Sequence, residues 1–335
     1  MVFVVLSVAI VFDIGFGCLG GGVSSLGVGI GGIGVGVGIL SGLGAGDEMF
    51  MIKMNTSINN IIKLNKNKVV FIMGATGTGK SRLSVDLAIY FSAEIINSDK
   101  MQVYKGLDIV TNKITDSEKQ GVTHYLLDEI DPASDFTSEN FCAQANCYIE
   151  KIISRGYVPI IIGGSNSYIE KLVEDPTFMF KSNYDSCFIW IDVDVSTLDP
   201  FLRKRVDHMV QKGLVDEVRG IFSPDADYSR GIRLSIGVPE MDKYFREENK
   251  FGPCEESTKK LLLESAVEEI KVNTCNLVRH QLEKIRRLMD EKMWPLHRID
   301  ATNVFKEKEK EGADNKWKHD VLKPCLEIMK EFLKQ

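Results

Sequence analysis

Short apolar runs alternate with amphipathic stretches through the middle of the chain. The apolar runs are rich in β-branched residues and end at glycines or polar residues, as buried strands do. They occupy residues 68–73, 93–99, 157–164 and 187–194. Between them, at residues 79–92 and 138–156, apolar residues recur with the spacing of a helix. Strands that alternate with helices indicate a parallel sheet covered by helices, so the pattern predicts an α/β fold.

Beyond this region the pattern becomes that of long amphipathic helices. Residues 199–222 and 256–292 have helical spacing throughout, whereas residues 305–320 are charged and predict a solvated linker before a last short helix from about Val321. We therefore expect one domain over residues 65–335. Its α/β core covers about 65–197, and its mainly helical portion covers about 198–335.

The first 64 residues differ from the rest in composition. Residues 1–46 contain 15 of the 29 glycines and neither Lys nor Arg. Alternating Gly and Val gives little side-chain volume and a large backbone entropy cost, so we expect a disordered leader over residues 1–64. Its apolar run, residues 2–12, is shorter than the ~20 residues of a membrane-spanning helix, so no stable membrane span is expected. It also lacks the basic residues of a typical signal or transit peptide.

The net charge and the cysteines indicate which partners and which cellular environment to expect. The formal net charge is −6, whereas proteins that bind nucleic acids usually present a basic face, so DNA is not expected as a partner. The seven cysteines are scattered without a C-x-x-C pair or a zinc-ligand spacing. We interpret them as the reduced thiols of an intracellular protein.

The strongest motif is GATGTGKS, which fits the phosphate-binding pattern G-x-x-x-x-G-K-[ST]. A predicted strand precedes it and a predicted helix follows it, as the pattern requires. Its glycines allow backbone N–H groups to face phosphate oxygens, Lys80 supplies a positive charge, and Ser81 can bind Mg²⁺. The motif predicts a P-loop NTPase-like fold with a bound nucleotide or other diphosphate. Its residues are Gly74, Ala75, Thr76, Gly77, Thr78, Gly79, Lys80 and Ser81.

Two aspartates are candidates at the ends of later strands. Ligands of parallel sheets lie at the carboxyl ends of the strands, so Asp99 is expected to share a crevice with the phosphate loop. From spacing alone, Asp99 can equally be a helix N-cap or a group near Mg²⁺. Asp192 follows four apolar strand residues and is a second candidate for Mg²⁺.

The remaining candidate ligand-binding residues can also be explained by helix capping or by solvation. Ser165 and Asn166 follow a predicted strand, and they either cap the next helix or reach the ligand. Arg205 and Lys113 belong to charged segments whose ordinary role is solvation.

Six segments occur together in the order found in isopentenyltransferases, which transfer a dimethylallyl group to adenine. They are GATGTGKS, INSDKMQVYKGLDIVTNK, IIGGSNSYIE, RVDHMVQKGLVDEV, RLSIGVPE and NTCNLVRHQLEKI. The chain resembles this family over roughly residues 68–289, and its plant adenylate branch most closely. The tRNA-modifying branch usually has Thr-Gly-Leu at residues 165–167 and Gln-Ser-Ile-Gly at 234–237, where this chain has Ser-Asn-Ser and Leu-Ser-Ile-Gly. Ala75 stands where the family often has Pro.

The resemblance implies roles for individual residues. Asp99 matches the family's base, which accepts a proton from the adenine N6 amine as the amine attacks the allylic carbon. Thr76 matches the residue that contacts the bridging oxygen of the leaving diphosphate, and Lys80 and Ser81 match residues that meet the diphosphate together with Mg²⁺. The resemblance also implies phosphate contacts for Lys113, Arg205 and Arg279.

These matches imply dimethylallyl diphosphate and ATP or ADP, with AMP as a further acceptor, as substrates in the first step of cytokinin biosynthesis. From the same resemblance we expect a monomer. We expect it most often in plastids and also in the cytoplasm or mitochondria. Three alternative functions stay open. The first is a dimethylallyltransferase acting on tRNA, although tRNA is less favoured than ATP or ADP as the acceptor. The others are a small-molecule P-loop kinase and a nucleotide-binding module without catalysis.

Overall fold

The computed structural model describes residues 5–8, 26–30, 33–38, 66–248 and 256–334. It divides into two compact units, Met1–Asn65 and Lys66–Gln335. No helix within the described ranges is long and apolar enough to cross a membrane.

The first unit contains three short strands. They are β1 (Val5–Val8), β2 (Leu26–Ile30) and β3 (Ile33–Gly38), and they form an antiparallel sheet in the order β1-β3-β2. The strand pairing satisfies the backbone groups of these stretches, and the disordered leader expected over residues 1–64 stays a prediction. The other residues of this leader lie outside the described part of the chain.

The second unit is built on a six-stranded sheet in which every strand pair is parallel. The strand order is β6-β5-β7-β4-β8-β9. The strands are β4 (Asn67–Met73), β5 (Ala93–Asn97), β6 (His124–Tyr125), β7 (Val158–Ile162), β8 (Tyr184–Asp192) and β9 (Leu296–Asp300). The predicted α/β fold with its parallel sheet is therefore confirmed.

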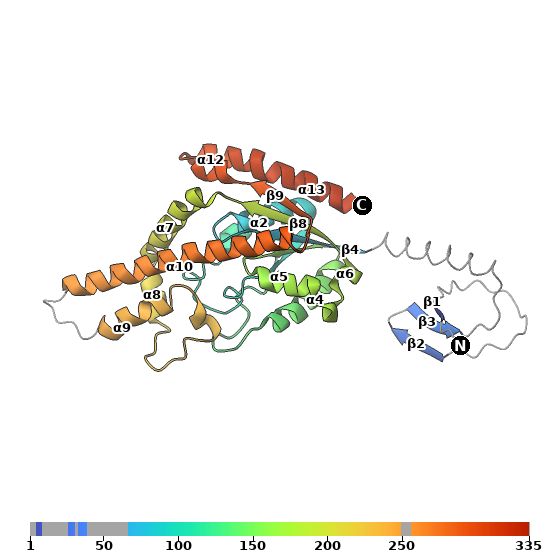
Figure 1. The fold of residues 1–335 in the computed structure, drawn as a ribbon, viewed down its shortest axis with the longest axis horizontal. Helices are drawn as coiled ribbons and strands as arrows, with labels where there is room; N and C mark the ends of the chain where they lie inside the picture. The colour runs from blue at the N-terminus through green and yellow to red at the C-terminus, as the bar shows by residue number, and fades with distance from the viewer. Residues whose placement is uncertain (1–4, 9–25, 31–32, 39–65, 249–255, 335) are drawn as a thin grey trace, which may run out of the picture. The chain divides into compact units, whose positions relative to one another are not determined.

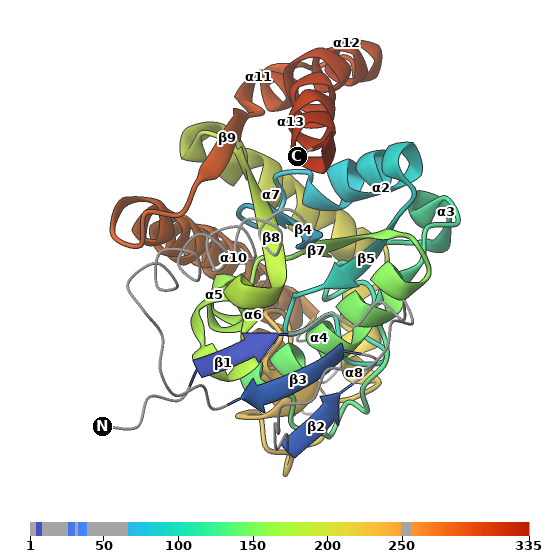
Figure 2. The same ribbon diagram turned by 90° about the vertical axis from the view of Figure 1, so that its right-hand side faces the viewer.

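Helices cover both faces of this sheet (Figures 1 and 2). Helices α2 and α13 lie on one face, whereas α4 and α5 lie on the other. The helices are α2 (Lys80–Phe91), α3 (Asp116–Lys119), α4 (Ser138–Ser154), α5 (Asn166–Glu174), α6 (Phe180–Asn183), α7 (Val195–Gln211), α8 (Leu214–Arg219), α9 (Asp242–Glu248), α10 (Glu256–Asp290), α11 (Thr302–Lys306), α12 (Lys310–Lys316) and α13 (Lys323–Lys334).

The core lies along the central strand β4. Residues 69–73 of this strand are fully buried because helices cover both faces of the sheet, which explains their uninterrupted apolar run. Phe71 stacks on Phe188 of β8 with ring centroids 4.8 Å apart, and its edge meets Phe180 at 5.6 Å. This packing fixes the position of the loop that follows β4.

The C-terminal part departs from the prediction in two places. Residues 305–320 were expected to be a solvated linker, but they include α12 and the start of a π-helical segment, Trp317–Leu322. The prediction was wrong because Trp317, within the charged stretch, is buried and begins a stripe of buried side chains that continues every four residues at Val321, Cys325 and Met329. The strand β9 was also not predicted, and it extends the sheet beyond β8.

Replacing Phe71 by alanine tests the importance of the β4 packing. We expect Phe71→Ala to lower the free energy of unfolding by about 3 to 5 kcal/mol, because it leaves a cavity between two rings. Leu261→Ala is the control, since Leu261 is 65 % exposed and should change stability by about 0.5 kcal/mol or less. Urea unfolding measures both variants, and equal losses would contradict this account of the core.

Candidate active site

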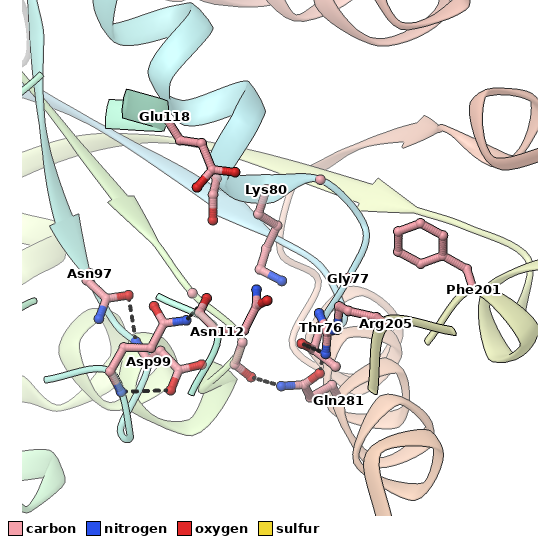
Figure 3. A pocket seen from close by; sticks show the side chains of 15 residues that line it. Thr76, Gly77, Lys80, Asn97, Asp99, Asn112, Glu118, Phe201, Arg205 and Gln281 are labelled. Atoms are coloured by element: carbon pink, nitrogen blue, oxygen red, sulfur yellow. Dashed lines mark hydrogen bonds between the residues drawn. The ribbon is translucent and has the colours of Figure 1, made fainter. Parts of the chain in front are cut away.

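A cavity of about 330 Å³ opens at the carboxyl ends of the central strands. The phosphate loop after β4, the turn after β5 and the glycine pair after β7 meet there, with α7 and α10 closing one side (Figure 3). Its lining consists of Thr76, Gly77, Gly79, Lys80, Ser81, Asn97, Asp99, Gln102, Asn112, Glu118, Gly163, Gly164, Phe201, Arg205 and Gln281.

The phosphate loop has the backbone shape that its glycines predict. Gly77 and Gly79 have φ angles of 82° and 93°, a region that side chains other than glycine rarely adopt. The Thr78 hydroxyl donates to the carbonyl oxygen of Ala75 at 3.0 Å and ties the loop to itself. Gly74, Ala75 and Thr78 are buried and do not line the cavity, so they shape the loop from behind.

Two cations at the cavity have no carboxylate partner among the described residues. Lys80 Nζ donates to the carbonyl oxygen of Ala75 at 2.6 Å, and Arg205 Nη2 donates to Thr76 Oγ1 at 3.3 Å. Arg205 Nε is buried without a hydrogen-bond partner. A buried cation without a counter-ion is costly, so this wall of the cavity is suited to an anion.

Burial also changes the proton affinity of both cations. It lowers the pKa of Lys80 to about 8, with the nearby Asp99 carboxylate opposing the effect and Arg205 adding to it. Burial alone lowers the pKa of Arg205 to about 10. A phosphate would supply the missing negative charge, so this burial agrees with a phosphate site, and the binding roles of Lys80 and Arg205 stay predictions.

Asp99 lies across the cavity from Lys80 (Figure 3). Its Oδ1 accepts hydrogen bonds from the backbone N–H groups of Met101 at 2.9 Å and Gln102 at 3.4 Å. No described residue donates to Oδ2 or forms an ion pair with this carboxylate. The turn after β5 thus orients Asp99 and leaves one oxygen free to accept a proton or a hydrogen bond in the cavity.

Gln281 joins the phosphate loop to the glycine pair after β7. Its Oε1 accepts from the Thr76 N–H at 2.8 Å, and its Nε2 donates to the Gly164 carbonyl oxygen at 3.1 Å. We did not predict this role, although the sequence holds a signal for it. Gln281 is a polar residue on a mainly apolar buried stripe that includes Val278 and Ile285.

Several other lining residues were also missed. Gln102 Nε2 donates to the carbonyl oxygens of Thr111 at 3.0 Å and Asn112 at 3.2 Å, which closes the loop between β5 and α3. Asn97 Nδ2 donates to the Leu126 carbonyl oxygen at 3.0 Å. Gln102 lies in an irregular segment, where periodicity gives no signal, and Asn97 is the last residue of β5, where the strand pattern does not identify a lining side chain.

Ser165 and Asn166 do not line the cavity, although both were predicted to bind the ligand or cap a helix. Neither caps α5 with its side chain. Ser165 Oγ accepts from the backbone N–H of Lys100 at 3.1 Å, and Asn166 Nδ2 donates to the Gln281 carbonyl oxygen at 3.2 Å. They support the Asp99 turn and α10 from behind.

Lys113, which was expected to contact phosphate, forms ion pairs with carboxylates of the protein. Lys113 is 5 % exposed and forms ion pairs with Asp108 at 2.8 Å and Asp128 at 2.6 Å, so its charge is already neutralised. The structure therefore gives it a structural role in place of the expected phosphate contact.

Arg279 and Asp192 are likewise absent from the cavity lining. Arg279 pairs with Asp199 at 2.8 Å on the outer side of α10 and α7. Asp192, the alternative candidate for Mg²⁺, pairs with Arg298 at 2.6 Å and links β8 to β9. Sequence spacing does not reveal which charged partner a side chain has. The phosphate contact of Arg279 and the Mg²⁺ contact of Asp192 stay predictions, and this placement does not support them.

The fold is an α/β fold of the P-loop type, and its cavity places two cations without carboxylate partners among the described residues opposite the Asp99 carboxylate. The family model described as "IPP transferase" matches residues 102–182 and 175–288. A relative named adenylate isopentenyltransferase 5, chloroplastic, from Arabidopsis thaliana is 54 % identical over 270 residues, which are 80 % of this chain and 81 % of the relative. The chain therefore belongs to the IPP transferase family.

Other relatives carry related names. Adenylate isopentenyltransferase 7, mitochondrial, from Arabidopsis thaliana is 47 % identical, with 80 % of each chain covered. An adenylate isopentenyltransferase from Humulus lupulus is 41 % identical, with 78 % of this chain and 89 % of the relative covered.

Solved structures support the fold. A eukaryotic dimethylallyltransferase acting on tRNA matches with a TM-score of 0.66 at 23 % identity, covering 80 % of each chain. The tRNA isopentenylpyrophosphate transferase of Bacillus halodurans matches with a TM-score of 0.63 at 24 % identity, covering 80 % of this chain and 99 % of that one.

The lowered pKa of Lys80 predicts pH-dependent binding of inorganic diphosphate. With a pKa of about 8, the Lys80 ammonium loses its proton as pH rises from about 7 to about 9, so affinity should fall over this range. Lys80→Gln should bind roughly tenfold or more weakly at about pH 7, because a charge-assisted hydrogen bond is lost. Isothermal titration calorimetry measures both profiles.

Diphosphate itself titrates over this pH range and affects the wild type and Lys80→Gln equally, so Lys80→Gln serves as the control. The difference between the two profiles therefore reports Lys80. Parallel profiles would contradict the assignment.

Proposed function

We propose that this protein transfers the dimethylallyl group of dimethylallyl diphosphate to the N6 amine of adenine in ATP or ADP, with AMP as a further acceptor. Diphosphate is the second product, and the reaction is the first step of cytokinin biosynthesis. The observation that carries the proposal is the placement of the Asp99 carboxylate across one cavity from the unpaired cations Lys80 and Arg205. The names of relatives at 41 % to 54 % identity support it.

The phosphate loop holds the donor. Backbone N–H groups at the start of α2, the Lys80 ammonium and the Arg205 guanidinium meet the diphosphate oxygens, on which negative charge grows as the carbon–oxygen bond breaks. Thr76 Oγ1 is oriented by Arg205 at 3.3 Å and contacts the bridging oxygen of the leaving group. These groups are fixed before the substrate arrives, so they stabilise the leaving group without reorganisation.

Asp99 acts as the base. The exocyclic amine of adenine is a poor nucleophile because its lone pair is conjugated with the ring. As its nitrogen forms a bond with the allylic carbon and diphosphate departs, the amine proton passes to the free Oδ2 of Asp99. A positioned base of this kind contributes about 10² to 10⁴ in rate.

Mg²⁺ is the proposed cofactor, and the donor atoms fit it. Ser81 presents its hydroxyl to the cavity and Glu118 a carboxylate, and both are the oxygen ligands that Mg²⁺ prefers. The described residues contain no group of three or more His, Cys, Asp or Glu side chains that could hold a metal ion. Mg²⁺ is usually held by one or two carboxylates together with substrate phosphates and water. Mg²⁺ would neutralise charge on the departing diphosphate, with Ser81 as its protein ligand.

We further propose a plastid location. It rests on the names of relatives, which are called chloroplastic or, in one case reported above, mitochondrial. Imaging of the full chain fused to a fluorescent protein tests it, and a signal confined to the cytoplasm would contradict it.

Product identification tests the proposed reaction. The protein is incubated with dimethylallyl diphosphate and an equimolar mixture of AMP, ADP, ATP and undermodified tRNA, and products are identified by mass spectrometry. We expect N6-dimethylallyl ADP and ATP with release of diphosphate. Prenylated tRNA as the main product would favour the tRNA alternative, and ADP formed from ATP without prenylation would indicate a kinase.

Asp99→Asn tests the base. We expect turnover to fall by about 10² to 10⁴ while diphosphate binding persists, since the amide keeps the turn but cannot accept the proton. Asp175→Asn is the matched control, because Asp175 Oδ1 also accepts from the N–H two residues later, at 3.0 Å, but lies outside the cavity. Full turnover by Asp99→Asn would show that another group accepts the proton.

A further inference from the structure

The ring of Trp317 lies directly against the phosphate loop. Trp317 is 2 % exposed. A Cβ atom added to Gly79 would come within 2.7 Å of Trp317 Cζ3 and 2.8 Å of Cη2, so the six-membered ring touches the backbone just before Lys80. Gly79 therefore has to be glycine for its positive φ and also for this contact.

Helix α2 holds this ring in place. Trp317 Nε1 donates to Asp86 Oδ2 at 2.9 Å. The Arg82 guanidinium lies over the ring with its central carbon 4.6 Å from the centroid, and it also pairs with Asp314 at 2.9 Å. The ring has contacts on its edge and its face, which leaves it little freedom to move.

The C-terminal helices anchor Trp317 to the body of the domain. It begins the π-helical segment Trp317–Leu322, and short π-helical segments occur frequently at functional sites. Val321, Cys325 and Met329 continue its buried stripe into α13. Lys330 of α13 lies 5.0 Å from the ring centroid of Tyr90, at the far end of α2.

We propose that Trp317 is a positioning residue for the transfer reaction. Its ring supports the outer side of Gly79 and so fixes the N–H groups at the start of α2 and the Lys80 ammonium for the diphosphate of the donor. Gly79 joins the phosphate loop to α2 and has no side chain that would restrict its backbone motion. A packing contact from another segment is therefore needed to hold it in place. The proposal rests on the proposed function, and Trp317 lies beyond residue 288, where the family match ends.

Trp294 offers a matched control. It is 6 % exposed, and its Nε1 donates to Glu174 Oε1 at 2.7 Å, so it resembles Trp317 in burial and bonding. Neither tryptophan lines the cavity, and they differ in their neighbours: the Trp294 ring packs on Phe188 with centroids 4.5 Å apart, whereas the Trp317 ring lies against Gly79. A purely structural role would make the two tryptophans equivalent for ligand binding.

The experiment compares Trp317→Phe with Trp294→Phe in the full chain. Phenylalanine loses both the indole N–H and the atoms that touch Gly79. We expect both variants to lose stability in urea unfolding, but only Trp317→Phe to bind inorganic diphosphate about five- to tenfold more weakly by calorimetry. Its KM for dimethylallyl diphosphate should rise by a similar factor, and its KM for ATP should stay unchanged.

Asp86 gives a second test that leaves Trp317 in place. Asp86→Ala removes the acceptor of the indole N–H and should weaken diphosphate binding in the same direction. Asp86→Asn keeps an oxygen acceptor and should restore most of the affinity.

Equal diphosphate affinities and KM values for the two tryptophan variants, with no effect of Asp86→Ala, would overturn the role of Trp317. Wild-type protein that binds diphosphate but transfers no dimethylallyl group would contradict the proposed function, while the affinity comparison would still decide the role of Trp317. Wild-type protein that does not bind diphosphate would contradict both.

Discussion

The organising constraint of this molecule is positive charge that the protein does not neutralise itself. Lys80 and Arg205 meet the cavity without carboxylate partners among the described residues, and the start of α2 adds its own partial positive charge. Taking such charges out of water costs several kcal/mol for each ion. The packed sheet around Phe71 and Phe188 has to offset that cost until an anion binds.

Lys113, in the same domain, is a cation whose charge the protein does neutralise. Its ammonium is almost completely buried, yet Asp108, Asp128 and the carbonyl oxygen of Gly106 surround it. A cation that is fully paired stabilises a loop, whereas a cation left unpaired at a cavity is available to a ligand. The difference lies in the partners and not in the residue type, which is why the resemblance implied a phosphate contact for both lysines.

The sequence predicted those parts of the fold and site that depend on local patterns. The central strands follow from apolar runs, the phosphate loop from its glycines and Lys80, and the place of Asp99 from the rule that ligands bind at strand ends. It did not reveal contacts between distant segments. The Arg298 partner of Asp192, the Gln281 bridge and the burial of Trp317 within the charged residues 305–320 all depend on three-dimensional neighbours.

The position of Trp317 near the end of the chain has a consequence for biosynthesis. Its hydrogen bond to Asp86 joins residues 231 positions apart, whereas the phosphate loop and α2 are translated early. Contacts of such large sequence separation form late, and domains are made from the N-terminus onward. A chain still on the ribosome thus carries the complete loop sequence before Trp317 is available, and the phosphate loop gains its contact with this ring only after residue 317 has been translated and released.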